Sequence, residues 1–347
     1  MRHEIRVGRH LIGDGQPLFI VAEAGVTCNY DLGITRELID VVRDAGADAI
    51  KLIFWFPDEI MSDRGISYTY DTVEGERSEN MYQMLEALRF TLDEWFEVKR
   101  YADERGVTLF STVNSPGGIE YAEKLGLLAY KLSSWDYNYA PLWRQIAALG
   151  KPMIMDTGPV TSLDVAKVLR IMQDAGNDQA VLVHCTHTDD SAELNMRTIP
   201  YLRNAFGCPV GYSAKGREWD TDIMAVTLGA SFLEKRLTMS RRLPGHHHIL
   251  SLEPSEFAEY VKRVRNAQAA QGVFDLIPSP ADLQERGQWF RHLVARTDLR
   301  KGTRLTADML EGKRPEKGVS PEHLELFVGR ELKRDLTRDE AISWDDV

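Results

Sequence analysis

Three short apolar runs, whose composition predicts buried β-strands, each end in a lysine: Lys51, Lys131 and Lys235. An ammonium group in that position lies at the edge of a sheet, where it can bind a carboxylate or a phosphate. A single lysine of this kind is usually a surface cation or half of an ion pair. Because the pattern recurs in three distant parts of the chain, we expect the fold to assemble one cationic pocket that holds a small anion.

The other predicted strands end in polar residues that add to this chemistry. Glu23 is a carboxylate that can move a proton or orient a second substrate, and hydroxyl groups can donate hydrogen bonds to an anion. Besides the lysines, the residues at the strand ends are Glu23, Thr112, Ser134, Asp156, Thr157, His184, His187, Ser213, Lys215, Glu234 and Arg236. This set predicts a site that binds an anion and transfers protons beside it.

Short β-rich runs alternate along the chain with amphipathic helical stretches, which is the pattern of βα units around a parallel sheet. Several helical stretches end at glycine, as at Gly46 and Gly150. The predicted strands lie near residues 18–24, 48–54, 107–112, 128–133, 152–157, 180–185, 209–213 and 230–235. Eight units of this kind predict an α/β fold, a (β/α)8 TIM barrel, whose active site lies at the carboxyl ends of its strands.

The segments outside the strands predict the domain organisation. Residues 1–272 are expected to form the barrel domain, with a β-hairpin at 3–17 that turns at the Gly-Asp-Gly of 13–15 and closes the amino-terminal face of the barrel. The stretch 273–285 contains two prolines and predicts a linker. Residues 286–347 are expected to form a small domain of short strands.

Composition limits the classes of function. The 347 residues carry a formal charge of −11, which disfavours nucleic acid as a partner because duplex binding relies on clustered basic residues. No apolar segment predicts a signal peptide or a membrane span. The cysteines Cys28, Cys185 and Cys208 form no disulfide pattern, so we expect a cytoplasmic protein without membrane contact.

Motifs along the whole chain resemble those of a known family, the sialic acid synthases with a C-terminal antifreeze-like (SAF) domain. The matching motifs, in chain order, are FIVAEAG (19–25), AGADAIKL (45–52), LAYKLSS (128–134), GKPMIMDTG (150–158), VLVHCT (181–186), CPVGYS (208–213), LGASFLEK (228–235), LPG and SLEP (243–254) and KRPEKGVSP (313–321). The resemblance covers the whole chain and implies a synthase that condenses phosphoenolpyruvate (PEP) with an amino-sugar aldehyde.

The resemblance also implies roles for individual residues. It gives Glu23 as the catalytic glutamate. It implies that Arg314, in the antifreeze-like domain, reaches the acceptor in the partner subunit of a domain-swapped homodimer. The residues that it implies for PEP binding are Lys51, Thr112, Lys131, Ser134 and Ser213.

The chain departs from the family at the positions of two metal-binding histidines, which are Lys215 and Arg236 here. A cationic side chain has no lone pair for a metal ion. We therefore expect neither the family's divalent metal nor any other cofactor. In this interpretation Lys215 and Arg236 supply the positive charge next to the reacting oxygen.

The residues implied to contact the acceptor are also changed. The positions that the resemblance implies to contact the hydroxyl and acetyl groups of a sugar are occupied here by His187, Asp189 and His247. These changes predict an unusual aldehyde or sugar acceptor from a carbohydrate or specialised-metabolite pathway. The polar stretch 58–80 predicts a loop over the site.

Three alternatives stay open from the sequence. A lysine crowded by other cations, with Lys215 the candidate, can lose its proton and form a Schiff base, as in a class I aldolase or lyase. The chain can also be a ligand-binding homologue without catalysis. A new metal site can form from His184, His187, Asp189, His246, His247 and His248.

Overall fold

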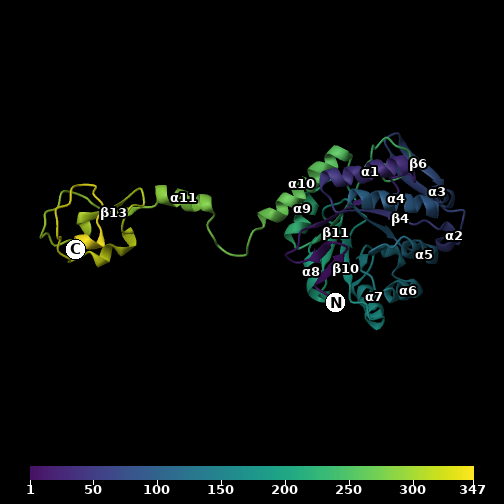
Figure 1. Cartoon of the computed structure of the whole chain (residues 1–347), viewed down its shortest axis with the longest axis horizontal. Helices are drawn as coiled ribbons and strands as arrows, with labels where there is room; N and C mark the ends of the chain where they lie inside the picture. The colour runs from purple at the N-terminus through teal and green to yellow at the C-terminus, as the bar shows by residue number, and fades with distance from the viewer. The chain divides into compact units, whose positions relative to one another are not determined.

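The computed structural model describes all residues from Met1 to Val347, and the chain divides into two units, Met1–Gly272 and Val273–Val347. In the first unit, eight parallel strands close into a barrel (Figure 1). These strands are β3 (Phe19–Glu23), β4 (Ala49–Ile53), β7 (Thr108–Thr112), β8 (Tyr130–Leu132), β9 (Met153–Asp156), β10 (Ala180–Cys185), β11 (Val210–Ser213) and β12 (Phe232–Arg236). The predicted (β/α)8 barrel is confirmed.

The barrel strands are apolar because both of their faces are covered. Alternate side chains, such as Phe19, Val21 and Phe232, fill the interior of the barrel. Their neighbours, such as Ile20 and Leu233, pack outward against the helices. This alternation decides which strand-end residues face the mouth of the barrel and which face the helices.

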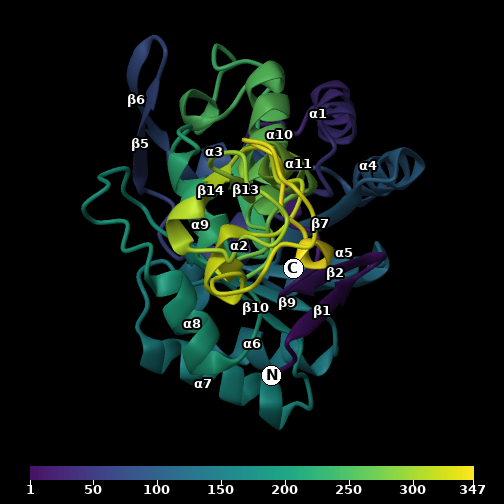
Figure 2. The same cartoon turned by 90° about the vertical axis from the view of Figure 1, so that its left-hand side faces the viewer.

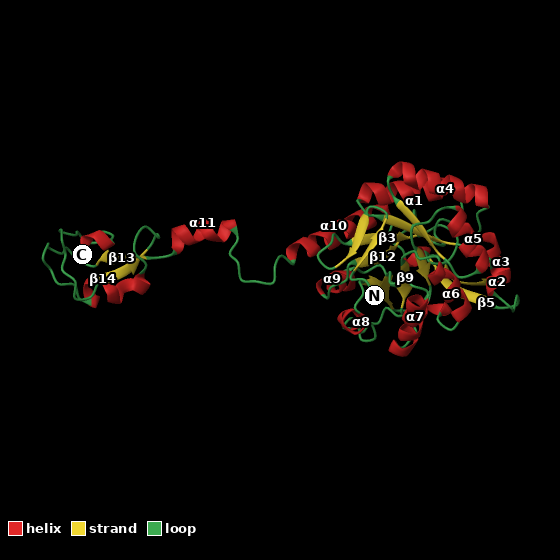
Figure 3. Cartoon of the chain, turned by 60° about the horizontal axis from the view of Figure 1, so that its bottom comes forward, coloured by secondary structure: helices red, strands yellow, loops and turns green.

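Helices surround the strands (Figure 3). The helix that follows β3 is stopped by Gly46, which adopts the left-handed conformation with φ of 75° that glycine tolerates. The main helices are α1 (Leu32–Ala45), α4 (Leu92–Arg105), α5 (Pro116–Lys124), α6 (Ala140–Ala148), α7 (Ser162–Asp174), α8 (Thr198–Phe206), α9 (Asp220–Thr227) and α10 (Pro254–Ala270). No helix of the chain has both the length and the apolar character that crossing a membrane requires.

The amino-terminal hairpin is formed by β1 (Glu4–Val7) and β2 (His10–Gly13), which pair in antiparallel fashion. Its side chains Ile5 and Val7 join the apolar cluster inside the barrel, so the hairpin plugs the barrel as predicted. The predicted turn at 13–15 is wrong. The chain reverses at Gly8, whose φ of 59° suits a tight turn, and the later glycines follow the second strand.

The stretch 58–80 is not a loop. It contains the end of the short helix α2 (Pro57–Ile60) and a β-hairpin of β5 (Ser67–Thr72) and β6 (Gly75–Asn80), and α3 (Met81–Ala87) follows. The hairpin projects from the barrel as a separate ribbon (Figure 2). Alternating Tyr and Thr in β5 favour a strand despite the acidic composition that suggested a loop.

The second unit, Val273–Val347, has a small core of its own around Leu293, Leu305 and Phe327. It contains α11 (Pro280–Trp289), β13 (His292–Ala295), β14 (Leu310–Lys313) and several 3-10 turns. Part of the predicted linker is therefore helical. Ser279 caps α11 and Pro280 occupies its first turn, so this proline starts a helix.

Candidate active site at the mouth of the barrel

Strand β12 sends consecutive side chains to opposite faces of the barrel. Glu234 points into the mouth, where it meets lysines from other strands, whereas Lys235 points outward to Asp222 on α9, at 2.8 Å. The expectation that Lys235 contributes to the cationic pocket is therefore wrong. The period of two along a strand already carried this signal, because adjacent residues cannot share a face.

Glu234 joins two of the three predicted lysines. Its carboxylate accepts hydrogen bonds from Lys51 Nζ at 3.0 Å and from Lys131 Nζ at 2.6 Å. Burial by itself raises the pKa of Glu234, but the two ammonium groups outweigh burial and bring this pKa to about 2. Glu234 is thus a permanent anion that fixes two cations, a role that the sequence did not single out.

Lys131 is fully buried and has a second carboxylate partner. Its Nζ lies 2.8 Å from Asp156 Oδ1, in addition to its contact with Glu234. Burial lowers the pKa of Lys131, but the carboxylates of Asp156 and Glu234 raise it above its ordinary value. Burial also raises the pKa of Asp156, against the opposing effect of Lys131. Lys131 therefore stays protonated and is not a nucleophile.

Glu23 has one occupied and one free oxygen. Oε1 accepts a hydrogen bond from the Gly25 amide at 2.9 Å and lies 3.6 Å from Lys51 Nζ. Oε2 is buried without a hydrogen-bond partner, and Arg236 Nε, 3.7 Å away, is also buried without one. Buried polar groups normally find partners, so this facing pair marks a place where a ligand can bind.

The two cations that replace the expected metal ligands differ in their surroundings. Arg236 donates from Nη1 to the carbonyl oxygens of Lys215, at 2.6 Å, and Ala214, at 3.3 Å, and its Nε faces Glu23. Lys215 lies nearer the rim, with its side chain 35% exposed and its Nζ 3.5 Å from Asp189. Arg236 belongs to the interior of the site and Lys215 to its edge.

A cavity of about 400 Å³ opens above Arg236. The hairpin β5–β6 forms one wall, where the stacked rings of Tyr68 and Tyr70 contact His246. The predicted site residues that line this cavity are His187, Asp189, Ser213, Lys215, Arg236 and His247. The predicted residues Glu23, Lys51, Thr112, Lys131 and Ser134 are buried residues near the carboxyl ends of their strands and do not line this cavity.

The histidines do not gather into a metal site. His184 points outward and its Nε2 contacts the Leu194 carbonyl at 2.7 Å, whereas His248 Nδ1 contacts Thr238 Oγ1 at 2.8 Å. No three His, Cys, Asp or Glu residues of the chain are arranged to hold a metal ion, so the histidine-based alternative is wrong. Lys215 and Arg236 do not fit the family's divalent ion either, because both side chains only donate hydrogen bonds.

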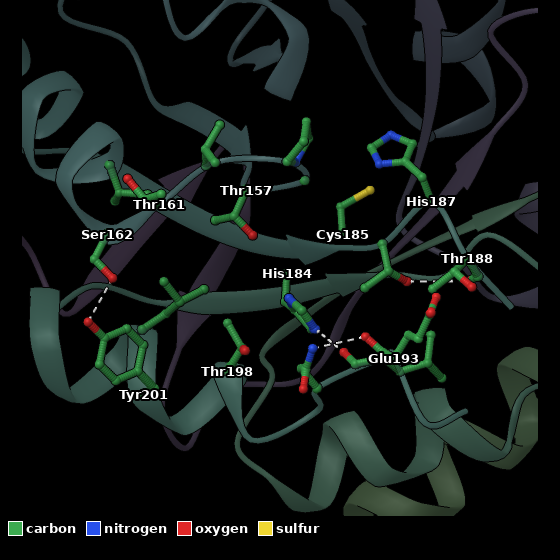
Figure 4. A pocket seen from close by; sticks show the side chains of 18 residues that line it. Thr157, Thr161, Ser162, His184, Cys185, His187, Thr188, Glu193, Thr198 and Tyr201 are labelled. Carbon is green, nitrogen blue, oxygen red and sulfur yellow. Dashed lines mark hydrogen bonds between the residues drawn. The ribbon is translucent and has the colours of Figure 1, made fainter. Parts of the chain in front are cut away.

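A second pocket of about 560 Å³ adjoins the first and shares Cys185, Thr186 and His187 with it. Its walls carry many hydroxyl groups, including Ser162 and Tyr201, whose oxygens are 2.8 Å apart (Figure 4). It lies between the segment that leads into α7 and the segment that leads into α8. Thr157 and His184 of its lining belong to quoted motifs and were predicted at the strand ends, whereas the residues from the loops into α7 and α8 carry no motif, so the pocket as a whole was not predicted.

Arg314 belongs to the second unit, where its contacts are local. Its Nε donates a hydrogen bond to the Trp289 carbonyl at 2.7 Å, and its guanidinium lies over the Trp289 ring. Its expected contact with a partner subunit's site stays a prediction.

The closed barrel and its ring of ionised strand-end residues define a (β/α)8 protein with a polar site at the carboxyl ends of its strands. The chain belongs to the NeuB family, which it matches over residues 38–275, and residues 290–347 match the SAF domain. The resemblance to the sialic acid synthases with an antifreeze-like domain is therefore confirmed.

Several known proteins are similar over nearly the full length. An uncharacterized protein of Methanocaldococcus jannaschii is 29% identical over 346 residues, 99% of this chain and 98% of that protein. The N,N'-diacetyllegionaminic acid synthase of Legionella pneumophila is 28% identical, with 96% of each chain covered. The structure of the Bacillus subtilis spore coat polysaccharide biosynthesis protein SpsE matches with a TM-score of 0.67 and 26% identity, over 99% of each chain.

Proposed function

We propose that this protein is a synthase that forms a C–C bond between a three-carbon donor and an unusual aldehyde or sugar acceptor. The donor is PEP or a close enolpyruvyl or 2-oxo acid analogue. The observation that carries this proposal is the buried free oxygen of Glu23 facing Arg236, next to Lys51. The names of two relatives, N,N'-diacetyllegionaminic acid synthase and human N-acetylneuraminate-9-phosphate synthase, support a sugar-acid product.

The donor's carboxylate would bind at the bottom of the mouth. The groups that can hold it there are the ammonium groups and hydroxyls of Lys51, Thr112, Lys131, Ser134 and Ser213. Ser213 is close enough to take part, because its Oγ is 3.5 Å from Glu234 Oε1 in the same network. Charge-assisted hydrogen bonds of this kind are strong and fix the orientation of a carboxylate.

Glu23 would transfer the proton and Arg236 would stabilise the oxyanion. Glu23 Oε2 has no competing hydrogen bond, so it is free to accept a proton from a bound substrate. The Arg236 guanidinium is fixed by two carbonyl groups, which orients its positive charge before the reaction begins. In this mechanism neither a metal ion nor another cofactor takes part, and Lys215 adds positive charge from the rim.

The acceptor would occupy the cavity of about 400 Å³, between the two tyrosines of the hairpin and Arg236. His187, Asp189 and His247 would contact its polar groups. Arg314 would reach it from the partner subunit of a domain-swapped homodimer. We place this reaction in the cytoplasm, in a carbohydrate or specialised-metabolite pathway.

One observation favours the Schiff-base aldolase or lyase as a second candidate. Lys215 is the one lysine that lines the cavity, and its single carboxylate partner, Asp189, is 3.5 Å away and 53% exposed. Lys131, in contrast, is fully buried between two close carboxylates and is not available to a carbonyl group. Borohydride reduction in the presence of donor would then link the donor covalently to Lys215.

The direct test combines the full-length protein with PEP or pyruvate and a panel of aldehydes, with and without EDTA. We expect a new C–C product by mass spectrometry, unaffected by EDTA. Arg236→Met should lower the rate about 100- to 1000-fold, the loss typical of removing one oxyanion donor. A matched control is Arg170→Met, which removes an exposed helix-surface arginine that pairs only with Asp174. Absence of product with every aldehyde and both donors would refute the proposed function and leave a ligand-binding homologue.

A further inference from the structure

The pocket of about 560 Å³ beside the mouth of the barrel is lined by groups that the proposed reaction does not use. Seven of its 18 lining residues carry a hydroxyl group, among them Ser162, Thr198 and Tyr201. A hydroxyl group offers one donor and two acceptor positions, and the contact of Ser162 with Tyr201, at 2.8 Å, uses only part of that capacity. The volume lies within the range of pockets that bind small molecules.

This pocket holds no positive charge that could bind an anion. Neither lysine nor arginine is among its lining residues, and burial lowers the pKa of both His184 and His187, so these side chains are neutral at pH 7. The first turn of α7, which borders the pocket, already contains a carboxylate, because Asp164 caps it together with Thr161. The one ionised side chain of the lining is Glu193, which accepts hydrogen bonds. The lining therefore favours a neutral ligand with hydrogen-bond donors over a phosphate or a carboxylate.

Between the polar groups the walls of the pocket are apolar. Val165, Leu194 and Leu202 belong to the hydrophobic core and also line the pocket. The Tyr201 ring is 50% exposed, so it can pack against the C–H groups of a ligand while its hydroxyl group forms hydrogen bonds. Hydroxyl groups, one carboxylate and an exposed aromatic ring together suit the alternating C–H and O–H groups of a sugar.

The pocket shares a wall with the cavity above Arg236, because Cys185, Thr186 and His187 line both. Figure 4 shows Cys185 and His187 on one side of the pocket and the pair of Ser162 and Tyr201 on the opposite side. His187 is exposed, so the shared wall reaches the surface and a ligand can cross it there. A ligand whose aldehyde lies near Arg236 can therefore extend past His187 into the pocket.

We propose that this pocket binds a neutral glycosyl unit at the end of the acceptor remote from its aldehyde, so that the acceptor is larger than a single sugar. This inference rests on the proposed C–C bond-forming function and names the class of its acceptor. The cavity of about 400 Å³ holds the sugar with the reacting carbon, and the hydroxyl-lined pocket holds the unit attached to it. His187, in the shared wall, contacts the linkage between the two units.

The test measures sugar binding by the full-length protein without a donor. Calorimetry compares neutral reducing disaccharides (cellobiose, lactose, maltose and N,N'-diacetylchitobiose) with the monosaccharides at their reducing ends and with the 6-phosphates of those monosaccharides. We expect at least one disaccharide to bind at least about tenfold tighter than its monosaccharide. A 6-phosphate that binds tighter than every disaccharide, or equal binding of all the sugars, would overturn the inference.

A substitution at Ser162 tests whether the pocket is the cause. Ser162 is exposed in the first turn of α7, so an indole ring there fills the pocket without disturbing the core. Ser162→Trp should remove the advantage of about tenfold for the disaccharide and leave the binding of the monosaccharide unchanged. Ser255→Trp is the matched control, because Ser255 is exposed in the first turn of α10 and lines neither cavity.

The outcomes separate this inference from the proposed function. If no disaccharide is preferred, or Ser162→Trp keeps the preference, while monosaccharide aldehydes react with a donor, the inference is wrong and the synthase function stands. If Ser162→Trp abolishes the preference for a disaccharide but no aldehyde reacts with either donor, the pocket stands as a glycosyl-binding site and the synthase function fails. If no sugar binds and no aldehyde reacts, both proposals fail.

Discussion

The outer and inner faces of strand β12 both carry buried charged side chains, but only those on the outer face have all their hydrogen-bond partners. On the outer face, Lys235 binds Asp222 at 2.8 Å and the Glu218 carbonyl at 2.6 Å, and Tyr260 donates to the other oxygen of Asp222 at 2.9 Å. On the inner face, Arg236 approaches Glu23, and an atom of each side chain is left without a hydrogen bond.

The difference shows how buried charge can be assigned to structure or to function. The outer cluster is closed, because Lys235 and Asp222 are fully buried and each has hydrogen-bond partners. The inner cluster is incomplete and borders a cavity. Burial and ion pairing are common to both, so the unsatisfied atoms distinguish the site from the scaffold.

The largest effect on the inner face should come from Glu23→Gln. An amide cannot take a proton from the bound substrate, so product formation should fall about 100- to 10,000-fold. Folding should be retained, because Oε2 has no hydrogen bond to lose. Kinetics and circular dichroism measure both quantities. Exposed Glu120→Gln on α5 serves as control, and comparable rates in both variants would remove Glu23 from the mechanism.

On the outer face, Lys235→Met should lower the free energy of unfolding by about 3–5 kcal/mol, because the buried carboxyl group of Asp222 loses its cationic partner. Urea denaturation measures this loss. Lys262→Met, which breaks an exposed pair on α10, should change stability by at most about 1 kcal/mol. A similar, small effect of both substitutions would contradict the structural role of the outer cluster.

Acid should weaken the inner network through Glu234. The pKa of this carboxyl is about 2 in the folded protein, against an ordinary value of 4.5, so its stabilising effect is complete above pH 4.5 and is lost as the pH falls towards 2. Glu234→Gln should therefore be less stable than wild type by about 3 kcal/mol at pH 7, with the gap shrinking through this window. Denaturation at pH 7, 5 and 3 gives the gap, and a constant gap would argue against the lowered pKa.

The smallest effect on stability is expected from Lys215→Met. Its pair with Asp189 is long and half exposed, so breaking the pair should change the free energy of unfolding by at most about 1 kcal/mol. A loss above about 3 kcal/mol in urea denaturation would mean that Lys215 belongs to the buried network and not to the rim.

Much of the scaffold is predictable because it depends on local patterns. The eight strands, the plug formed by the amino-terminal hairpin and the glycine that ends α1 follow from apolar runs, alternation and backbone preferences. The errors have physical reasons. The first hairpin turns at Gly8 and not at 13–15, because the segment contains three glycines and only the pairing of the two strands decides which of them lies in the turn. In the stretch 58–80, Tyr68 and Tyr70 favour a strand although the charge of the stretch suggested a loop.

The barrel, the membership in a family and the kinds of side chain at the strand ends can be deduced from the order of the residues, because periodicity and motifs are properties of neighbouring residues. How those side chains pair follows only from the folded barrel. Glu234 lies between Lys51 and Lys131 only because strands from distant parts of the chain meet in a closed barrel. Whether a buried charge is balanced or free depends on distances across that closure, and these distances exist only in the folded chain.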